Sequence, residues 1–171
     1  GQTLVAFQVH RVEDGVLQEH WDNLQEDVGV GVSGNTMVDG ATEVTDLDRT
    51  EENKEIGLGL VNAVLIGGDS SNITNFISSD QYIQHNPDVD NGIEGLIAAA
   101  PFFAAVEHDT VKIVVAEGNF VLVGAVGAVN STPTAFYDLM RIDDSELIVE
   151  HWDVLQAIPP PEEFAHENGK F

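Results

Sequence analysis

The sequence contains no cysteine and only six lysine and arginine residues among 171. Without cysteine there is no disulfide framework, no thiolate metal site and no cysteine nucleophile. The sequence has 30 acidic residues, and this excess over the basic ones excludes the positive surface that nucleic acid or an anionic membrane would need. The sequence also lacks the run of about 18 apolar residues that a membrane helix requires. We therefore expect a soluble, cytoplasmic protein that binds neither nucleic acid nor membrane.

Acidic residues are spread along the whole chain and give it a formal net charge of −24. A disordered acidic tail would contain few apolar residues, whereas this chain is 43% hydrophobic. Repulsion between the charges opposes a compact fold in dilute buffer, but at about 1 M salt the screening length falls to about 3 Å. We interpret the surface as adapted to high salt, as in a halophilic protein.

Two segments far apart in the sequence are similar to each other. Residues 7–25 read FQVHRVEDGVLQEHWDNLQ, and residues 136–156 read FYDLMRIDDSELIVEHWDVLQ. Each has a strand, an arginine, an acidic turn, a second strand and Glu-His-Trp-Asp in this order, so each is predicted to form a β-hairpin. We interpret residues 1–25 as a copy of the hairpin that ends the domain in residues 50–171, and residues 26–49 as a linker.

Residues 50–171 are predicted to contain helices followed by a sheet. Thr50 is a candidate N-cap of a helix that ends at Gly67-Gly68, and residues 92–103 are predicted to form another helix. Pro87 favours an extended backbone before it. Four strands are predicted, at 110–117, 119–126, 134–141 and 147–156. This order predicts an α+β fold in which helices pack on one face of a curved antiparallel sheet, with a pocket between the layers.

Four motifs follow one another in this domain. They are Tyr-Ile-Gln-His-Asn-Pro at 82–87, Gly-Ile-Glu-Gly at 92–95, Ala-Glu-Gly-Asn-Phe-Val at 116–121, and Glu-His-Trp-Asp at 150–153. In this order they resemble SnoaL-like proteins, a polyketide cyclase family of the nuclear transport factor 2-like superfamily. The resemblance implies a cone-shaped α+β fold, a small-molecule substrate and a homodimer. The superfamily also contains ketosteroid isomerases, epoxide hydrolases and plain binding domains, so the fold alone does not decide the function.

The last predicted strand carries the candidate catalytic residues. Because side chains alternate along a strand, His151 and Asp153 point to one face and Trp152 to the other. A carboxylate in an apolar pocket has a raised pKa, which suits a base that removes a proton next to a carbonyl. The family resemblance makes Asp153 the candidate base. His151 would hold the enolate oxygen or shuttle the proton, and His85 would supply a second donor. Alternatively, His151 and Asp153 form a structural hydrogen-bonded pair, and His85 braces the end of its strand.

Tyr82, Asn86 and Trp152 are the candidate substrate-binding residues, although packing in the core is favoured for Tyr82, and packing in the core or an interface for Trp152. Among the remaining histidines, His108 shows no pairing pattern and is expected to be exposed. No spacing matches a standard metal-ligand motif, a phosphate-binding loop or a dinucleotide fingerprint. Neither a metal nor an organic cofactor is therefore predicted.

These features predict a cofactor-independent enzyme that abstracts a proton next to a carbonyl. Such chemistry would promote an aldol-type cyclisation or an isomerisation of a hydrophobic, polyketide-like substrate. The alternative is a non-catalytic ligand-binding or dimerisation domain of the same fold, in which the polar residues only orient a bound molecule. The enzyme hypothesis requires that Asp153 lies deep in an enclosed pocket and has a raised pKa, whereas the binding-domain hypothesis does not.

Overall fold

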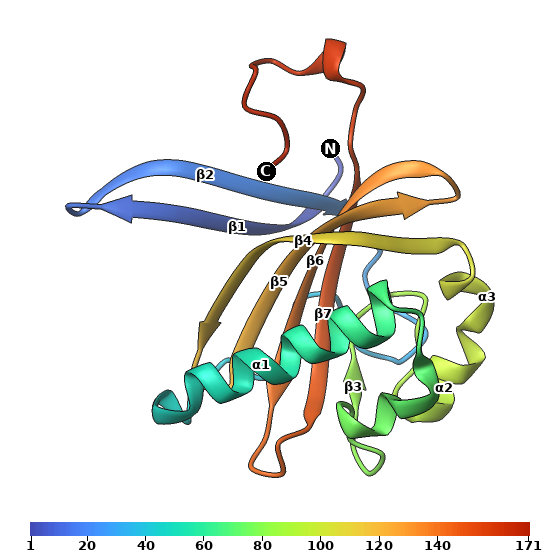
Figure 1. Cartoon of the computed structure of the whole chain (residues 1–171). Helices are drawn as coiled ribbons and strands as arrows, with labels where there is room; N and C mark the ends of the chain where they lie inside the picture. The colour runs from blue at the N-terminus through green and yellow to red at the C-terminus, as the bar shows by residue number, and fades with distance from the viewer.

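A five-stranded sheet forms the centre of the molecule (Figure 1). The computed structural model describes residues 1–171, and the strand order in this sheet is β3-β7-β6-β5-β4. All neighbouring strands are antiparallel except β3 and β7, which are parallel. The strands are β3 (Ile83–Gln84), β4 (Val106–Glu117), β5 (Phe120–Val129), β6 (Thr132–Ile142) and β7 (Ile148–Ala157). The predicted meander is confirmed, because each of the four predicted strands lies within or overlaps one of β4 to β7.

Helices cover one face of the curved sheet, and in Figure 1 the continuous helix of α1 and η2 runs across the sheet while α2 and α3 lie beside β3 and the start of β4. The helical segments are η1 (Leu47–Arg49), α1 (Thr50–Leu60), the π-helical η2 (Val61–Ile66), η3 (Ser70–Asn75), α2 (Gly92–Ala98), α3 (Ala100–Phe103) and, near the C-terminus, η4 (Pro161–Glu163). The main core lies between α1, η2 and the sheet, where Leu60 and Val61 meet Val121, Val123 and Met140. None of the helices is both long and apolar enough to cross a membrane.

Thr50 begins α1, but it is not the N-cap that the sequence predicts, because Arg49 holds that position. The Thr50 hydroxyl donates to the carbonyl of Leu47 and accepts from the backbone N–H of Gly118, at 2.9 and 2.8 Å. Asn53, one turn later, donates to the Gly118 carbonyl. These bonds tie the start of α1 to the turn between β4 and β5.

The N-terminal hairpin packs on the opposite, convex face of the sheet. Its strands are β1 (Leu4–Glu13) and β2 (Val16–Glu26). Asn23 is fully buried, and its amide donates to the carbonyls of Ala135 and Val154 at 3.0 and 2.6 Å. The far half of the hairpin projects past the sheet (Figure 1) and exposes Val12, Val16 and Leu17.

Residues 27–46 follow the same convex face without forming a helix or a long strand. Trp152 donates its indole N–H to the carbonyl of Asp39 at 2.7 Å, and Met37 is buried against Val154. Gly40 has a φ of +108°, and a Cβ there would collide with the side chains of Glu150, Trp152 and His85. This segment therefore covers part of the convex face that the hairpin leaves open.

Candidate active site

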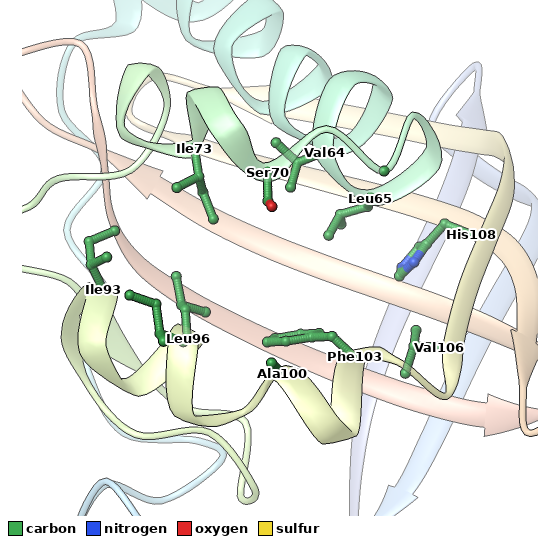
Figure 2. A pocket seen from close by; sticks show the side chains of 12 residues that line it. Val64, Leu65, Ser70, Ile73, Ile93, Leu96, Ala100, Phe103, Val106 and His108 are labelled. Carbon is green, nitrogen blue, oxygen red and sulfur yellow. The ribbon is translucent and has the colours of Figure 1, made fainter.

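A cavity of about 540 Å³ lies between the helices and the sheet. Figure 2 shows Val64 and Leu65 on one side, Leu96 and Phe103 on the other, and His108 at one end. Nine of its 12 lining residues are hydrophobic, so it suits the carbon skeleton of an apolar molecule.

A second, inner cavity of about 70 Å³ adjoins the first. His108, Phe103 and Val106 line both cavities, so the inner one extends the outer one toward the sheet. Its floor carries the polar side chains of Asp138 and His151. Polar groups thus lie on the sheet side of an otherwise apolar pocket.

The alternation of side chains along β3 decides which residues of the Tyr-Ile-Gln-His-Asn-Pro segment lie on the same side of the sheet as this floor. Gln84 pairs in register with His151 of the parallel strand β7. Tyr82, Gln84 and Asn86 therefore share the face of His151 and Asp153. The structure brings four of the predicted residues together here, namely Tyr82, Asn86, His151 and Asp153.

Gln84, which no sequence pattern marks as a site residue, determines which nitrogen of His151 carries a proton. Its side-chain oxygen accepts from the backbone N–H groups of His85 and Asn86, both at 2.9 Å, which identifies that atom as oxygen. The same oxygen lies 3.0 Å from Nδ1 of His151, so Nδ1 must carry a proton. Nε2 of His151 then faces Oδ1 of Asp138 at 3.1 Å.

His151 and Asp138 form a buried acid–base pair. Burial acts to lower the pKa of His151, but the hydrogen bond with Asp138 and the negative charges of Asp153 and Asp138 outweigh it, so the pKa is raised. The imidazole is therefore held in its charged form to a higher pH than in water. In that form it places a positive charge beside the floor of the cavity.

Asp153 lies next to this pair and is 8% exposed. Asn86 donates to its Oδ2 at 2.7 Å, while Oδ1 has no hydrogen-bond partner within the chain. Burial raises the pKa of Asp153 to about 6, even though the nearby His151 opposes the shift. Asp153 itself does not line either cavity. A carboxylate oxygen of Asp138, a ring nitrogen of His151 and a carboxylate oxygen of Asp153 lie within 4.8 Å of one another.

Tyr82 lines the inner cavity with its hydroxyl close to these acids. The hydroxyl accepts from the Gln84 amide at 3.3 Å, which leaves its own proton without a partner in the chain. Burial, followed by the charges of Asp153 and Asp138, raises the pKa of Tyr82. Tyr82 is thus a permanent hydrogen-bond donor at the cavity floor.

His85 and Trp152 do not lie in the cavity, which corrects the site predicted from the sequence. Both point to the convex face, where their rings stack with centroids 4.6 Å apart. His85 bonds the carbonyl of Thr36 at 2.7 Å and Oε1 of Glu150 at 3.0 Å, and Arg141 bonds the other oxygen of Glu150. The reason is strand geometry, because His85 alternates with Gln84 and Asn86 just as Trp152 alternates with His151 and Asp153.

His108, which the sequence analysis expects to be exposed, is buried in the site. Its side chain is 7% exposed and lies against Phe136 with ring centroids 4.1 Å apart. The pairing of β4 with β5 slips by one residue after His108, at Asp109, and such a bulge re-aims the side chains beside it. Burial lowers the pKa of His108 and keeps its imidazole neutral. No local sequence pattern marks such a bulge.

Asp138, His151 and Asp153 are the one group of three side chains close enough to share a metal ion. Their arrangement fits a metal poorly, because both nitrogens of His151 already face partners, Gln84 and Asp138. A ligand nitrogen must present a free lone pair to the metal. The cluster is better suited to proton transfer than to metal binding.

Comparison with known proteins gives matches in structure. No family model matches the chain, and no curated protein matches it in sequence. A steroid delta-isomerase from Pseudomonas aeruginosa superposes with a TM-score of 0.52 at 17% identity, covering 63% of this chain and 82% of that chain. A candidate ketosteroid isomerase from Kribbella flavida superposes with a TM-score of 0.52 at 14% identity, covering 69% and 90% of the two chains. A loop truncation variant of IdmH matches at 24% identity over 61% of this chain and 92% of that one, with a TM-score of 0.48.

At these identities the similarity concerns the fold. The curved, unclosed sheet with helices on one face is the nuclear transport factor 2-like fold that the motifs predict, and the N-terminal hairpin is an addition to it. The chemistry of this chain depends on the residues of its own cavity.

Proposed function

We propose that the chain is a cofactor-independent enzyme that removes a proton from the carbon next to a carbonyl group of a hydrophobic substrate. The observation that carries this proposal is the buried cluster of Asp138, His151 and Asp153 beneath an apolar cavity. Isomerisation and aldol-type cyclisation of a polyketide-like molecule both begin with this step. The two structures that superpose with TM-scores above 0.5 are named as a steroid delta-isomerase and a ketosteroid isomerase, which supports an isomerisation.

Asp153 is the base in this mechanism. A pKa of about 6 makes it a stronger base than a carboxylate in water, yet leaves it ionised at neutral pH. Its Oδ1 has no partner in the chain and is therefore free to take a proton, while Asn86 holds Oδ2. Asn86 is a positioning residue, because its own oxygen accepts from the backbone N–H of Asp88 and so directs its amide toward Asp153.

Tyr82 and His151 stabilise the negative charge that develops on the carbonyl oxygen. The Tyr82 hydroxyl donates a hydrogen bond to that oxygen, and the proton stays on Tyr82 because its pKa is raised. His151 has no free N–H, so it acts through its positive charge, which the contact with Asp138 maintains. After the step Asp153 is protonated and returns the proton to another carbon or to an oxygen.

Hydrogen exchange tests this proposal without knowledge of the natural substrate. Wild-type protein is incubated in D₂O with 2-acetylnaphthalene and with 1-tetralone, and loss of the signal of the protons next to the carbonyl is followed by NMR. We expect Asp153→Asn to slow the catalysed exchange by about 10²-fold or more, because the amide does not accept the proton. Asp144→Asn, in the exposed turn after β6, is the matched control and should exchange like the wild type.

A different result would favour the non-catalytic alternative. If wild type and Asp153→Asn bind the ketones with equal affinity and neither accelerates exchange, the cavity is a binding site and the proposed mechanism is wrong. Tyr82→Phe separates the role of Tyr82 as a hydrogen-bond donor from the role of Asp153 as the base. It should lower the exchange rate, while the pH at which Asp153 titrates stays near that of the wild type.

A further inference from the structure

Two buried polar atoms at the inner cavity have no hydrogen-bond partner within the chain and face each other. They are Nε2 of His108 and Oδ2 of Asp138, 4.0 Å apart, on side chains that are each 7% exposed. The distance is too long for a direct hydrogen bond. Oδ1 of Asp138 is already bonded to His151, so Oδ2 is the atom that Asp138 presents to a ligand. Buried polar groups without partners are unfavourable, so both atoms favour a ligand that satisfies them.

We propose that His108 and Asp138 recognise a hydroxyl group of the substrate, so that the substrate class is a hydrophobic ketone that also carries a hydroxyl. The ketone part rests on the proposed function, whereas the hydroxyl part rests only on the geometry of these two side chains. Neither residue is assigned this role by the proton-transfer mechanism, in which Asp138 serves only to keep His151 charged.

A hydroxyl is the group that fits this donor and acceptor. Burial keeps His108 neutral, and the neighbouring carboxylate favours the tautomer with the proton on Nε2. An oxygen about 2.8 Å from both atoms accepts from His108 and donates to Asp138. A ketone oxygen cannot donate to Asp138, and a carboxylate would be repelled by it. A hydroxyl therefore satisfies both atoms with one oxygen.

The surroundings of the pair make the recognition selective. Phe103, Val106 and Phe136 line the inner cavity beside His108 and offer only apolar contacts. A hydroxyl placed elsewhere against these walls would lose its hydrogen bonds to water. The β-bulge after His108 and the tilted contact of its ring with Phe136 hold the imidazole in place, so the donor is already oriented before a ligand binds.

Matched ligands test the proposal on the full chain. The dissociation constants of 6-acetyl-2-naphthol and 2-acetylnaphthalene are measured by fluorescence titration at high salt. We expect the hydroxylated ketone to bind the wild type at least about tenfold more tightly. In His108→Leu the two ligands should bind with similar affinity, while 2-acetylnaphthalene binds as in the wild type, which also shows that the variant is folded. His108→Asn retains an N–H donor and should recover part of the preference.

The outcomes distinguish this proposal from the proposed function. Equal affinities of the two ketones for the wild type would overturn the hydroxyl site, as would a preference that survives in His108→Leu. Catalysed hydrogen exchange without a preference for the hydroxylated ketone would support the proton-transfer mechanism and overturn the hydroxyl site. A preference for the hydroxylated ketone without catalysed exchange would support the hydroxyl site and overturn the proton-transfer mechanism.

Discussion

Gln25 and Gln156 bond to each other's strands in a reciprocal way. The side-chain oxygen of Gln25 accepts from the backbone N–H of Leu155 at 2.8 Å, and that of Gln156 accepts from the backbone N–H of Leu24 at 3.1 Å. The two Leu-Gln pairs end the two similar segments of the sequence. The hairpins β1-β2 and β6-β7 therefore pack back to back with equivalent residues facing each other.

Strand pairing supports the same relationship. Arg11 pairs with Glu19 in the N-terminal hairpin, as Arg141 pairs with Glu150 in the domain. His20 and Asp22 stand in β2 where His151 and Asp153 stand in β7. We infer that residues 1–25 are a partial copy of the domain's last hairpin, and that residues 50–171 form the folding unit with which it packs.

Removal of the Asn23 side chain should detach the hairpin and weaken the fold. Asn23→Ala loses two buried hydrogen bonds to Ala135 and Val154, so we expect a loss of about 1–3 kcal/mol in the free energy of unfolding. Urea unfolding of the full chain at high salt measures it. Gln18→Ala, in the exposed part of the hairpin, is the control. Equal stability of both variants and the wild type would mean that the hairpin does not stabilise the domain.

Asp153 should destabilise the folded protein at neutral pH. Its pKa is about 6 when folded and about 3.9 when unfolded, so the folded state binds the proton more tightly. The resulting stability is complete below about pH 4 and is lost as the pH rises through about 6. Asp153→Asn avoids this loss and should be more stable than the wild type by roughly 2–3 kcal/mol at about pH 8. At about pH 4 the two should unfold alike. A variant that is less stable at both pH values would contradict a raised pKa.

The rate of hydrogen exchange should rise with pH because Asp153 must lose its proton before it acts as a base. With a pKa of about 6, the catalysed rate should increase through that pH and level off above it. The pH profile of exchange with 2-acetylnaphthalene, corrected for exchange without protein, measures it. A rise centred near the ordinary pKa of aspartate, about 3.9, would show that the base is not a buried carboxylate.

Salt should stabilise the protein strongly. Dilution to about 0.1 M salt lengthens the screening distance to about 10 Å and exposes the 30 acidic residues to mutual repulsion. The melting temperature measured by calorimetry should therefore fall markedly between molar KCl and dilute buffer. Sucrose at the same osmolality is the control, because it does not screen charge. A melting temperature that does not depend on salt would rule out the halophilic interpretation.

The homodimer stays a prediction, and the projecting half of the hairpin offers a surface for it. Val12 and Leu17 are 58% and 62% exposed, and both edges of the hairpin are unpaired. We expect the double variant Val12→Lys, Leu17→Lys to have a lower mass than the wild type in light scattering. Val28→Lys with Val30→Lys changes two equally exposed valines elsewhere and should leave the mass unchanged. Identical masses for all three proteins would place any dimer contact outside the hairpin.

Sequence patterns predict the features of this protein that depend on neighbours along the chain. The two hairpins, the meander and the shared face of His151 and Asp153 follow from turn residues and from the alternation of side chains. These predictions need only local geometry. Asp138 lies opposite Asp153, but counting back from the turn at Asp143 would place it opposite Trp152, because the pairing of β6 with β7 shifts by one residue between Arg141 and Ile142.

The remaining parts of the site depend on long-range pairing that no local pattern encodes. The face on which His85 lies is set by the parallel register between β3 and β7, which are separated by three strands in the sequence. His108 enters the cavity because the pairing of β4 with β5 shifts at Asp109. Gln84 becomes important only because its oxygen meets His151 from a strand distant in sequence.

The same tetrapeptide, Glu-His-Trp-Asp, thus occurs twice in one chain in two different environments. In β7 its histidine, His151, meets Asp138 and Gln84 beneath a layer of helices. In β2 the equivalent His20 is exposed to solvent and stacks on His10 across the hairpin. The residue opposite Asp22 in this hairpin is Gln8. The copy in β2 therefore shows that the tetrapeptide alone does not make a site. A scan for the tetrapeptide would report two sites, and only the one whose neighbours come from other strands has the surroundings for chemistry.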